Sequence, residues 1–429
     1  MSTGSSAVPP SLPPDPVPRR VALGGLAALT LVNLLNYLDR YVISALVPDL
    51  ERAHMGLNDF RLGTLMTGFL VVYMLFAPLF GVLGDRRSRT RAIAAGVLLW
   101  SFATALSGLA RNYFHLLAAR ALVGVGEAAY GTISPALLAD YFPLAKRGRV
   151  FAVFYMAIPV GSALGYIVGG LTSQAYGWRA AFLVAGLPGL ALAAWVLRLA
   201  DPPRGVQEQR HAAAAAPAGL ALYVSFLGRL PYMLTVLGYA AYTFAVGGLA
   251  FWMPTFLERT RGLSDAQATT GFGAIVVATG LLGTFAGGWL GDYWLKSSRE
   301  AYFWLSALTA LAAVPVSVVA LTASAPALYY PAIVVAELLL FMSTGPVNSA
   351  IVNLVAPAER ASAVALSVFV IHILGDVVSP PLIGEVSDVA SLGTAVLIVP
   401  AAIAACGVLW LAAGRAARSG RAPSDLVNG

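Results

Sequence analysis

The chain has 429 residues, of which 59% are hydrophobic and 11% are charged. Soluble domains are roughly 45–50% apolar and about 25% charged, so this composition excludes water as the solvent for most of the surface. The net charge of +7 comes from basic residues scattered through short loops. That scatter argues against a nucleic-acid-binding face, which would need these charges gathered together.

Cysteine and histidine usage excludes the commonest metal sites. The single cysteine, Cys406, lies inside an apolar run, so no intrachain disulfide and no cysteine-based metal site can form. The four histidines, at 54, 115, 211 and 372, match no metal-ligand spacing. No nucleophile–base constellation and no phosphate-binding glycine loop of the Walker type is present either. We therefore expect no metal, no cofactor, no enzymatic activity and no use of ATP.

The first twenty residues, 1–20, are rich in serine and proline and have too few large apolar residues to fold alone. We expect a disordered tail there. Arg19 and Arg20 precede an apolar stretch, as in a signal peptide, but this stretch continues into Asn36 and Asp39 without a small-residue cleavage site. It is therefore predicted to be a retained first membrane span.

Twelve segments are long and apolar enough to cross a bilayer, which requires about 20 mostly apolar residues. Six precede and six follow a polar, alanine-rich linker at 201–229. The predicted spans are 21–47, 60–83, 90–110, 113–140, 149–173, 179–200, 230–257, 268–291, 300–322, 328–354, 361–385 and 393–415. The sequence thus predicts an all-α membrane protein with six-helix bundles at 21–200 and 230–415 and a tail at 416–429.

The distribution of lysine and arginine predicts the orientation. The side that holds both termini and the even-numbered loops carries 19 of the 27 basic residues, the opposite side carries six, and Arg40 and Arg120 lie within spans. Because cytoplasmic loops are enriched in Lys and Arg, both termini are predicted to be cytoplasmic. Both termini can lie on the same side only if the number of spans is even, and the predicted number of twelve meets this condition.

The two halves repeat each other in sequence. Gly81, Gly84 and Asp85 after the second span correspond to Gly288, Gly291 and Asp292 after the eighth. Parallel six-span halves occur in secondary transporters, whose substrate site lies between the halves near the middle of the membrane.

These motifs carry a resemblance to the major facilitator superfamily. Segment 81–91 resembles its loop signature G-x-L-x-D-R-x-G-R, with Ser88 in place of one glycine. Stretches 33–40, 120–130, 154–166 and 201–205 resemble the spinster lysolipid and sphingosine-1-phosphate transporters. The resemblance covers roughly residues 30–205, whereas the second half matches only the general superfamily plan.

Seven ionisable residues lie inside the predicted spans. A charged side chain at the bilayer centre costs about 2.5–3.5 kcal/mol on insertion scales, so such residues normally face a cavity or a partner. They are Asp39, Arg40, Arg120, Glu127, Glu337, His372 and Asp376. Arg120 and Glu127 are two turns apart and share one face of their helix, while the adjacent Asp39 and Arg40 cannot both face one partner.

A carboxylate beside an arginine stays charged, but a desolvated carboxylate that loses its arginine takes up a proton. Proton binding and conformation would then be coupled. The spinster resemblance implies the same role, with Asp39, Arg120 and Glu127 as the proton switch. The alternative is a fixed ion pair that only joins two spans.

Candidate substrate contacts are Arg40, Glu337, Tyr239, Tyr242 and Asn348. Arg40 can pair with a phosphate in the bidentate manner of arginine. Glu337 precedes a polar, Gly-Pro-containing stretch that is typical of broken helices at transport sites, although a packing role for this carboxyl is nearly as well supported. His372 and Asp376, four residues apart, are predicted to form a structural pair.

Asp85, Arg86 and Arg89 form a predicted cytoplasmic gate. Asp85 can accept hydrogen bonds from the first N–H groups of a helix in the other half, and the arginines can bridge to carboxylates across the same gap. The simpler reading of these arginines is membrane orientation alone.

Gly161, Gly165 and Gly169 recur every fourth residue in the fifth span. Small residues at this spacing clear one helix face for close packing, and Pro159 before them is a candidate hinge.

The few interior charges of both signs, the apolar spans and the spinster resemblance together favour proton-coupled transport of a lysophospholipid-like or sphingosine-1-phosphate-like amphipath. The alternatives are a superfamily transporter of a small organic anion or drug, and an uncoupled lipid scramblase. The expected partners are the amphipathic lipid-like substrate, protons and membrane lipids, with no nucleic acid. The expected state is a monomer in a bacterial plasma membrane, since arginine and alanine are abundant and lysine is rare.

Overall fold

The computed structural model describes residues 17–206, 220–356 and 359–419 of the chain. Helices account for the regular structure of these residues. They are α1 Arg19–Ala45, α2 Val47–Arg52, α3 Asp59–Arg86, α4 Arg89–Ser107, α5 Tyr113–Tyr141, α6 Leu144–Tyr176, α7 Trp178–Gly186, α8 Pro188–Leu197, α9 Leu220–Leu227, α10 Leu230–Arg261, α11 Asp265–Leu295, α12 Ala301–Thr322, α13 Pro326–Phe341, α14 Thr344–Asn353, α15 Arg360–Ile371, the π-helical η2 His372–Asp376, α16 Ser379–Val389, α17 Leu392–Ala395 and α18 Ile398–Ser419.

Twelve spans form from these helices by length and composition, among the residues that the structure describes. This confirms the predicted number. In a bilayer every backbone N–H and C=O must be satisfied within the segment, which is why such apolar stretches fold as helices. Four spans consist of more than one helix: α7 with α8, α13 with α14, α15 with η2 and α16, and α17 with α18.

The breaks in the tenth and eleventh spans follow the sequence. Ser343 separates α13 from α14 at the predicted polar stretch. Gly375, within η2, has non-helical dihedral angles (φ −104°, ψ −105°). By contrast, α6 continues as one helix through Pro159.

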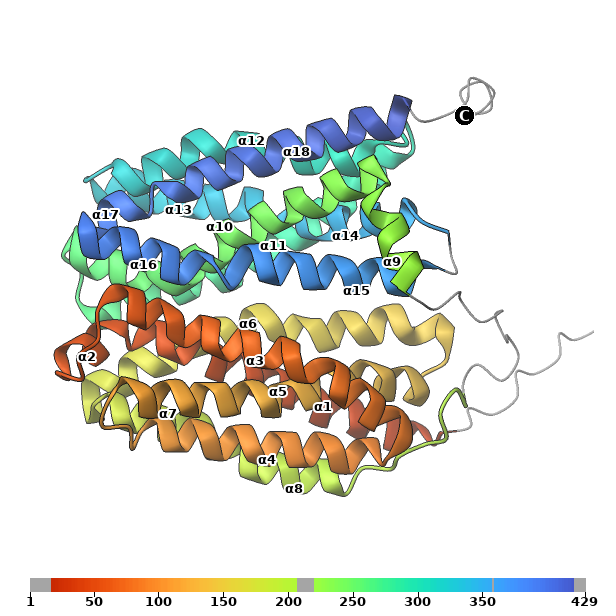
Figure 1. Cartoon of the computed structure of the whole chain (residues 1–429), viewed down its shortest axis with the longest axis horizontal. Coiled ribbons are helices and arrows are strands. Elements are labelled where there is room, and N and C mark those ends of the chain that lie inside the picture. Colours follow the sequence, from red (N-terminus) through yellow and green to blue (C-terminus); the bar gives the residue numbers. More distant parts are fainter. Residues whose placement is uncertain (1–16, 207–219, 357–358, 420–429) are drawn as a thin grey trace, which may run out of the picture.

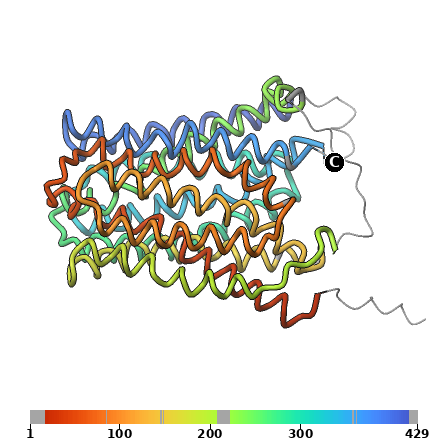
Figure 2. Tube along the Cα trace, turned by 60° about the horizontal axis from the view of Figure 1, so that its bottom comes forward, coloured from red at the N-terminus to blue at the C-terminus, as the bar shows by residue number. Residues whose placement is uncertain are grey.

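Two bundles lie side by side (Figure 1), one formed by α1 to α8 and the other by α10 to α18. The chain enters the first bundle and leaves the second at the same end of the molecule, as Figure 2 also shows. We call this end the terminal side and the other end the distal side.

Side-chain caps fix several helix starts. Asn58, Ser88 and Asn112 accept hydrogen bonds from the third N–H of α3, α4 and α5. Ser264 and Gln267 form a complete capping box at the start of α11. These residues satisfy N–H groups that have no partner within the helix.

The predicted linker contains structure that the sequence analysis did not anticipate. Helix α9 lies within 201–229, and Phe226 from α9 packs on Tyr232 of α10. Arg229 donates to both oxygens of Glu359, at 2.6 and 2.9 Å, and these hydrogen bonds lower the pKa of Glu359. The last part of the linker therefore packs on the second bundle, whose final helix, α18, ends at Ser419.

The halves touch on the distal side and in the middle of the bundle. Tyr166 of α6 donates to the Ala250 carbonyl of α10 at 2.6 Å, and Thr67 of α3 donates to the Val377 carbonyl at 2.6 Å. Further contacts between the halves lie farther toward the distal side, among them Arg52–Glu258 at 3.2 Å and Arg259–Asp59 at 2.8 Å. The conformation is thus closed on the distal side.

Candidate functional site

Two arginine–carboxylate pairs join α1 to α5 inside the first bundle. Arg40 Nη2 lies 2.8 Å from Glu127 Oε2, and Arg120 Nη1 lies 3.5 Å from Asp39 Oδ1. Asp39, Arg120 and Glu127 are completely buried. Two positive and two negative charges thus form a neutral cluster, as burial of charge requires.

The pairing differs from the arrangement suggested by helix periodicity. Arg120 and Glu127 share a face of α5, but each pairs with a residue of α1 rather than with the other. Asp39 and Arg40, about 100° apart on α1, reach two different turns of α5. The sequence placed all four residues inside the membrane, while the partners depend on the rotation of α1 against α5.

Hydrogen bonds satisfy the two carboxylates unequally. Thr104 of α4 donates to Asp39 Oδ2 at 2.7 Å, so both oxygens of Asp39 have a donor. Glu127 Oε1 is buried without a hydrogen-bond partner in the described structure, as are Nε and Nη2 of Arg120. Glu127 is therefore the less firmly held of the two acids.

Aromatic rings surround the arginines. The Arg40 guanidinium lies 5.0 Å from the ring centroid of Tyr37, 4.9 Å from that of Phe69 and 5.7 Å from that of Tyr73. Arg120 lies 5.2 Å from the ring of Phe69. Such contacts stabilise a desolvated cation. The sequence analysis missed these rings and Thr104, because nothing in their spacing marks them as neighbours of a charge.

A cavity of about 180 Å³ reaches one of the two pairs. Arg40 and Glu127 line it, together with His372 of the second half. Asp39 and Arg120 do not. The remaining lining residues are Asn33, Asn36, Tyr37, Leu70, Tyr73, Tyr130, Gly131, Pro135, Phe154, Tyr155 and Ile158. The cavity therefore lies between the halves, with the Asp39–Arg120 pair behind its wall.

Three of the predicted substrate contacts in the second half come together. The rings of Tyr239 and Tyr242 lie 5.8 Å apart. Asn348 Nδ2 donates to the Tyr239 hydroxyl at 3.2 Å, and the Tyr242 hydroxyl lies 3.2 Å from Thr344 Oγ1. These contacts join α10 to α14 just after the break in the tenth span.

Glu337 of α13 is 5% exposed and has no hydrogen-bond or ion-pair partner among the described residues. It lies within electrostatic range of Tyr41 and Tyr166 in the first half and of Tyr242 in the second. The carboxyl is therefore near the boundary between the halves.

His372 and Asp376 form the expected pair. His372 Nδ1 lies 2.9 Å from Asp376 Oδ1 and 3.1 Å from Oδ2. Since the pair spans η2, it holds together the turn in which Gly375 departs from helical geometry.

The glycine stripe of α6 packs on α1. A Cβ at Gly161 or Gly165 would lie 2.5 or 2.6 Å from a carbonyl oxygen of α1, and one at Gly169 would lie 2.9 Å from Ala45 Cβ. The stripe contacts the helix that carries Asp39 and Arg40, so it sets the position of the charged cluster.

The predicted gate lies at the terminal side. The side chain of Asp85 is outside the described part of the structure, and Arg86 is exposed at the end of α3. Arg89 is buried and donates to Asp140 and, at 2.8 Å, to Asp201 Oδ1. These partners belong to its own half and to the start of the linker. Bridges from the gate to the other half are expected only when the terminal side is closed, so the gate role of Arg89 stays a prediction.

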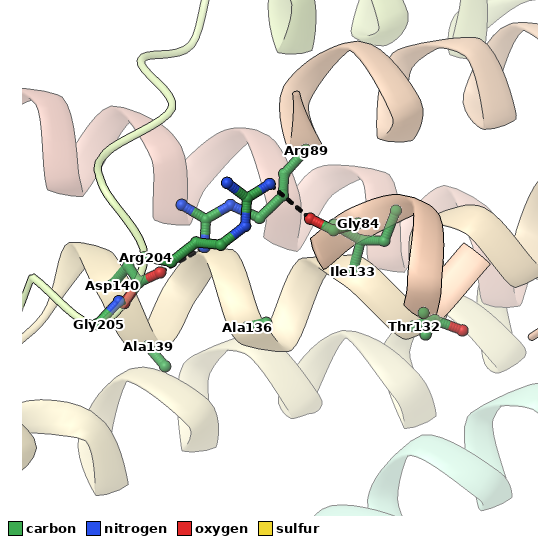
Figure 3. Close-up of a pocket in the computed structure, with 10 residues that line it drawn as sticks. Gly84, Arg89, Thr132, Ile133, Ala136, Ala139, Asp140, Arg204 and Gly205 are labelled. Carbon is green, nitrogen blue, oxygen red and sulfur yellow. Dashed lines mark hydrogen bonds and ion pairs between the residues drawn. The ribbon is translucent and has the colours of Figure 1, made fainter. Parts of the chain in front are cut away.

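The start of the linker packs against the terminal ends of α3 and α5, near Arg89 (Figure 3). Arg204 donates to the carbonyls of Gly84 and Arg87 at 2.7 and 2.6 Å, and the Gly205 N–H donates to Asp140 Oδ1 at 2.9 Å. Gly84, Asp140, Arg204 and Gly205 border a cavity of about 330 Å³ between the ends of α3 and α5. The Asp201–Gly205 motif thus fastens the linker to the first bundle.

No group of three or more His, Cys, Asp or Glu residues among those described is arranged to hold a metal ion. The site consists of buried ion pairs, aromatic rings and an inter-half cavity in a twelve-span, two-bundle fold.

Comparison with known proteins identifies the class of this fold. The Major Facilitator Superfamily model matches residues 29–380. A solved structure described as a bacterial homolog to the human lysosomal transporter Spinster, in an inward-facing and unoccupied conformation, covers 95% of this chain and 100% of its own with a TM-score of 0.85 and 22% identity. The chain therefore belongs to the major facilitator superfamily.

Curated relatives narrow the assignment. Protein spinster homolog 1 of Xenopus laevis is 36% identical over 377 residues, which are 83% of this chain and 71% of that protein. Protein spinster homolog 1 of Homo sapiens is 36% identical over 386 residues, which are 85% of this chain and 72% of that protein. Within the superfamily, the chain is a member of the spinster family.

Proposed function

We propose that this protein is a proton-coupled secondary transporter of a lysolipid-like amphipath, of the lysophospholipid or sphingosine-1-phosphate type, working by alternating access. Membership of a transporter superfamily and the two-bundle fold, with its distal and central contacts between the halves, support the transport mode. The observation that carries the proposal is the Arg40–Glu127 pair at the wall of the inter-half cavity.

Exchange of partners at Arg40 would provide the coupling. A substrate phosphate that binds the Arg40 guanidinium competes with Glu127 for the same donors. Glu127, fully buried, would then be an unpaired charge, and such a group takes up a proton rather than remain charged. Substrate and proton would therefore each favour binding of the other, as linkage requires.

Asp39 and Arg120 complete the switch in this proposal. They are within electrostatic range of the cavity pair, since Arg120 and Asp39 both act on Glu127. With a proton on Glu127, the two arginines and Asp39 carry a net charge of +1, and the substrate phosphate on Arg40 would supply the missing negative charge while Asp39 stays paired with Arg120. Movement of α1 against α5 would follow each exchange.

The walls of the cavity suit an amphipathic molecule. Tyr37, Tyr73 and Tyr155 offer ring faces, and Asn33 and Asn36 offer amide groups. An acyl chain can lie against such rings while a head group contacts the arginine and the amides. Tyr239, Tyr242, Asn348 and Glu337 are proposed to contact the substrate from the second half, with Glu337 facing a positive part of the head group.

The orientation and setting belong to the same proposal. The basic loops and both termini are placed in the cytoplasm by the positive-inside rule, so the closed distal side would face away from it. The gate role of Asp85, Arg86 and Arg89 would then apply to the opposite conformation, with the terminal side closed. We propose a monomer in a bacterial plasma membrane.

The test is uptake of a labelled lysophospholipid into proteoliposomes with and without an imposed pH difference. We expect gradient-driven uptake in the wild type, and loss of the gradient dependence in Glu127→Gln and Asp39→Asn at normal expression. Glu385→Gln, which removes an exposed carboxylate of α16 without a partner among the described residues, is the matched control.

Three outcomes would contradict the proposal in different ways. Equal flux with and without the gradient, unaffected by either variant, indicates a scramblase. No lysolipid uptake, and no competition by lysolipid against an organic anion that is taken up, indicates a different substrate. Wild-type, gradient-driven uptake in both variants excludes the charged cluster as the coupling site.

A further inference from the structure

The first turn of α3 donates two hydrogen bonds to the other half of the molecule. Asp388, near the end of α16, accepts from the backbone N–H groups of Asp59 at 2.9 Å and Phe60 at 3.0 Å, one with each carboxylate oxygen. The third N–H, of Arg61, donates to Asn58 in the usual capping position. The carboxylate of one bundle thus completes the cap of a helix in the other.

Asp59, in the first half, in turn accepts hydrogen bonds from side chains of the second half. Its carboxylate accepts from both terminal nitrogens of Arg259 in α10, at 2.8 and 2.9 Å, and from the Ser387 hydroxyl at 2.5 Å. Arg259 also reaches Glu51 of α2 at 2.8 Å. Each half therefore inserts an aspartate among donors of the other half.

Close helix approach makes these contacts possible. A Cβ at Gly384 of α16 would lie 2.3 Å from the Asp59 carbonyl oxygen, and a Cβ at Gly63 of α3 would lie 2.5 Å from the backbone of Pro380. Any larger residue at either position would separate the helices and pull Asp388 away from the first turn of α3.

The electrostatics favour this contact in one conformation only. A carboxylate at a helix N-terminus interacts favourably with the helix dipole, whereas Asp388 lies at the unfavourable C-terminal end of its own helix. Once the halves separate on the distal side, Asp388 loses the favourable dipole and keeps the unfavourable one. The two N–H groups of α3 and the Asp59 carboxylate lose their partners at the same moment.

We propose that Asp388, Asp59, Arg259 and Ser387 form a distal latch, in which mutual capping of the two halves sets the ratio of distal-closed to distal-open molecules. The latch is a set of contacts separate from the charged cluster on α1 and α5. This inference rests on the alternating-access part of the proposed function and is independent of the substrate and of proton coupling.

The test measures the distance between the halves without substrate or pH gradient. Nitroxide labels at Phe114→Cys and Leu328→Cys, two exposed positions at the distal ends of α5 and α13, report opening by pulsed electron paramagnetic resonance in nanodiscs. Cys406, which is buried, is replaced by alanine. We expect Asp388→Asn and Arg259→Gln to raise the ratio of open to closed molecules roughly two- to fivefold, as expected for partly exposed charged contacts.

Glu385→Gln, one turn earlier on α16 and with the same change of charge, is expected to leave the ratio unchanged. Unchanged distances in both latch variants, or an equal shift in the Glu385 control, would overturn the latch. Because the measurement uses neither substrate nor gradient, a failure of the latch and a failure of the proposed transport activity give different results.

Discussion

Among the residues around the charged cluster, Thr104 makes the hydrogen bond whose contribution to stability is easiest to test. Its hydroxyl donates to the fully buried Asp39 at 2.7 Å, and a hydrogen bond to a charged group contributes about 1.5–3 kcal/mol. Thr104→Val keeps the shape but leaves Asp39 with one long contact, at 3.5 Å to Arg120. We expect a lower unfolding temperature in detergent, whereas Thr104→Ser should remain near the wild type. Equal unfolding temperatures for the valine variant and the wild type would contradict this role.

At this scale the sequence identified the charges but not their partners. Asp39, Arg40, Arg120 and Glu127 were recognisable because charged residues are costly inside a membrane and rare there. Which acid meets which arginine depends on the rotation and depth of α1 against α5, and sequence spacing within one helix says nothing of either. The same holds for Thr104, since threonine is common in spans and no charge marks it.

Among the helices, the contact between α1 and α6 depends on the absence of side chains. A Cβ at Gly165 would lie 2.6 Å from the Leu38 carbonyl oxygen, next to Asp39. We expect Gly165→Ala to destabilise the protein by about 1–3 kcal/mol, the usual cost of overpacking, and to reduce transport because the charged cluster shifts with α1. Gly24→Ala, on the same α1 with nothing within 4 Å of the new Cβ, is the control. If Gly165→Ala left both stability and uptake unchanged, α1 and α6 would be able to separate without a cost in the free energy of unfolding.

The helices themselves were largely predictable, because an apolar segment of sufficient length has no other stable form in a bilayer. The break before Thr344 could also be read from its polar residues and the following Gly-Pro pair. Helix α9 could not be predicted in this way, because its eight residues are too few for a span and its stability comes from packing on Tyr232. The partners of Arg89 were missed for a related reason: Asp140 and Asp201 are distant in sequence and meet it only in the folded bundle.

For the whole molecule, the repeat of the Gly81 and Gly288 segments predicted two similar bundles but not which side would be closed. The sequence contains the residues for contacts on both sides. This structure has distal and central contacts between the halves, and the transport proposal requires them to break and form again. Under that proposal, relative movement of the two bundles would convert one state into the other.

Covalent closure of the distal side tests this movement directly. With Cys406 replaced by alanine, Phe60→Cys and Asp388→Cys place thiols where Asp388 now lies 3.0 Å from the Phe60 N–H. A bifunctional methanethiosulfonate, which forms a disulfide with each thiol and releases sulfinate, can then join the two bundles. We expect the cross-linked protein to lose transport and to regain it when a reductant cleaves the link. The control joins Thr64→Cys to Tyr113→Cys, whose native hydroxyls lie 2.8 Å apart on α3 and α5 of the same bundle at the same end. That link does not cross between the halves and should leave transport intact. Undiminished flux in the protein linked between 60 and 388 would mean that substrate crosses without distal opening, because a bond between the bundles permits no rocking of one against the other.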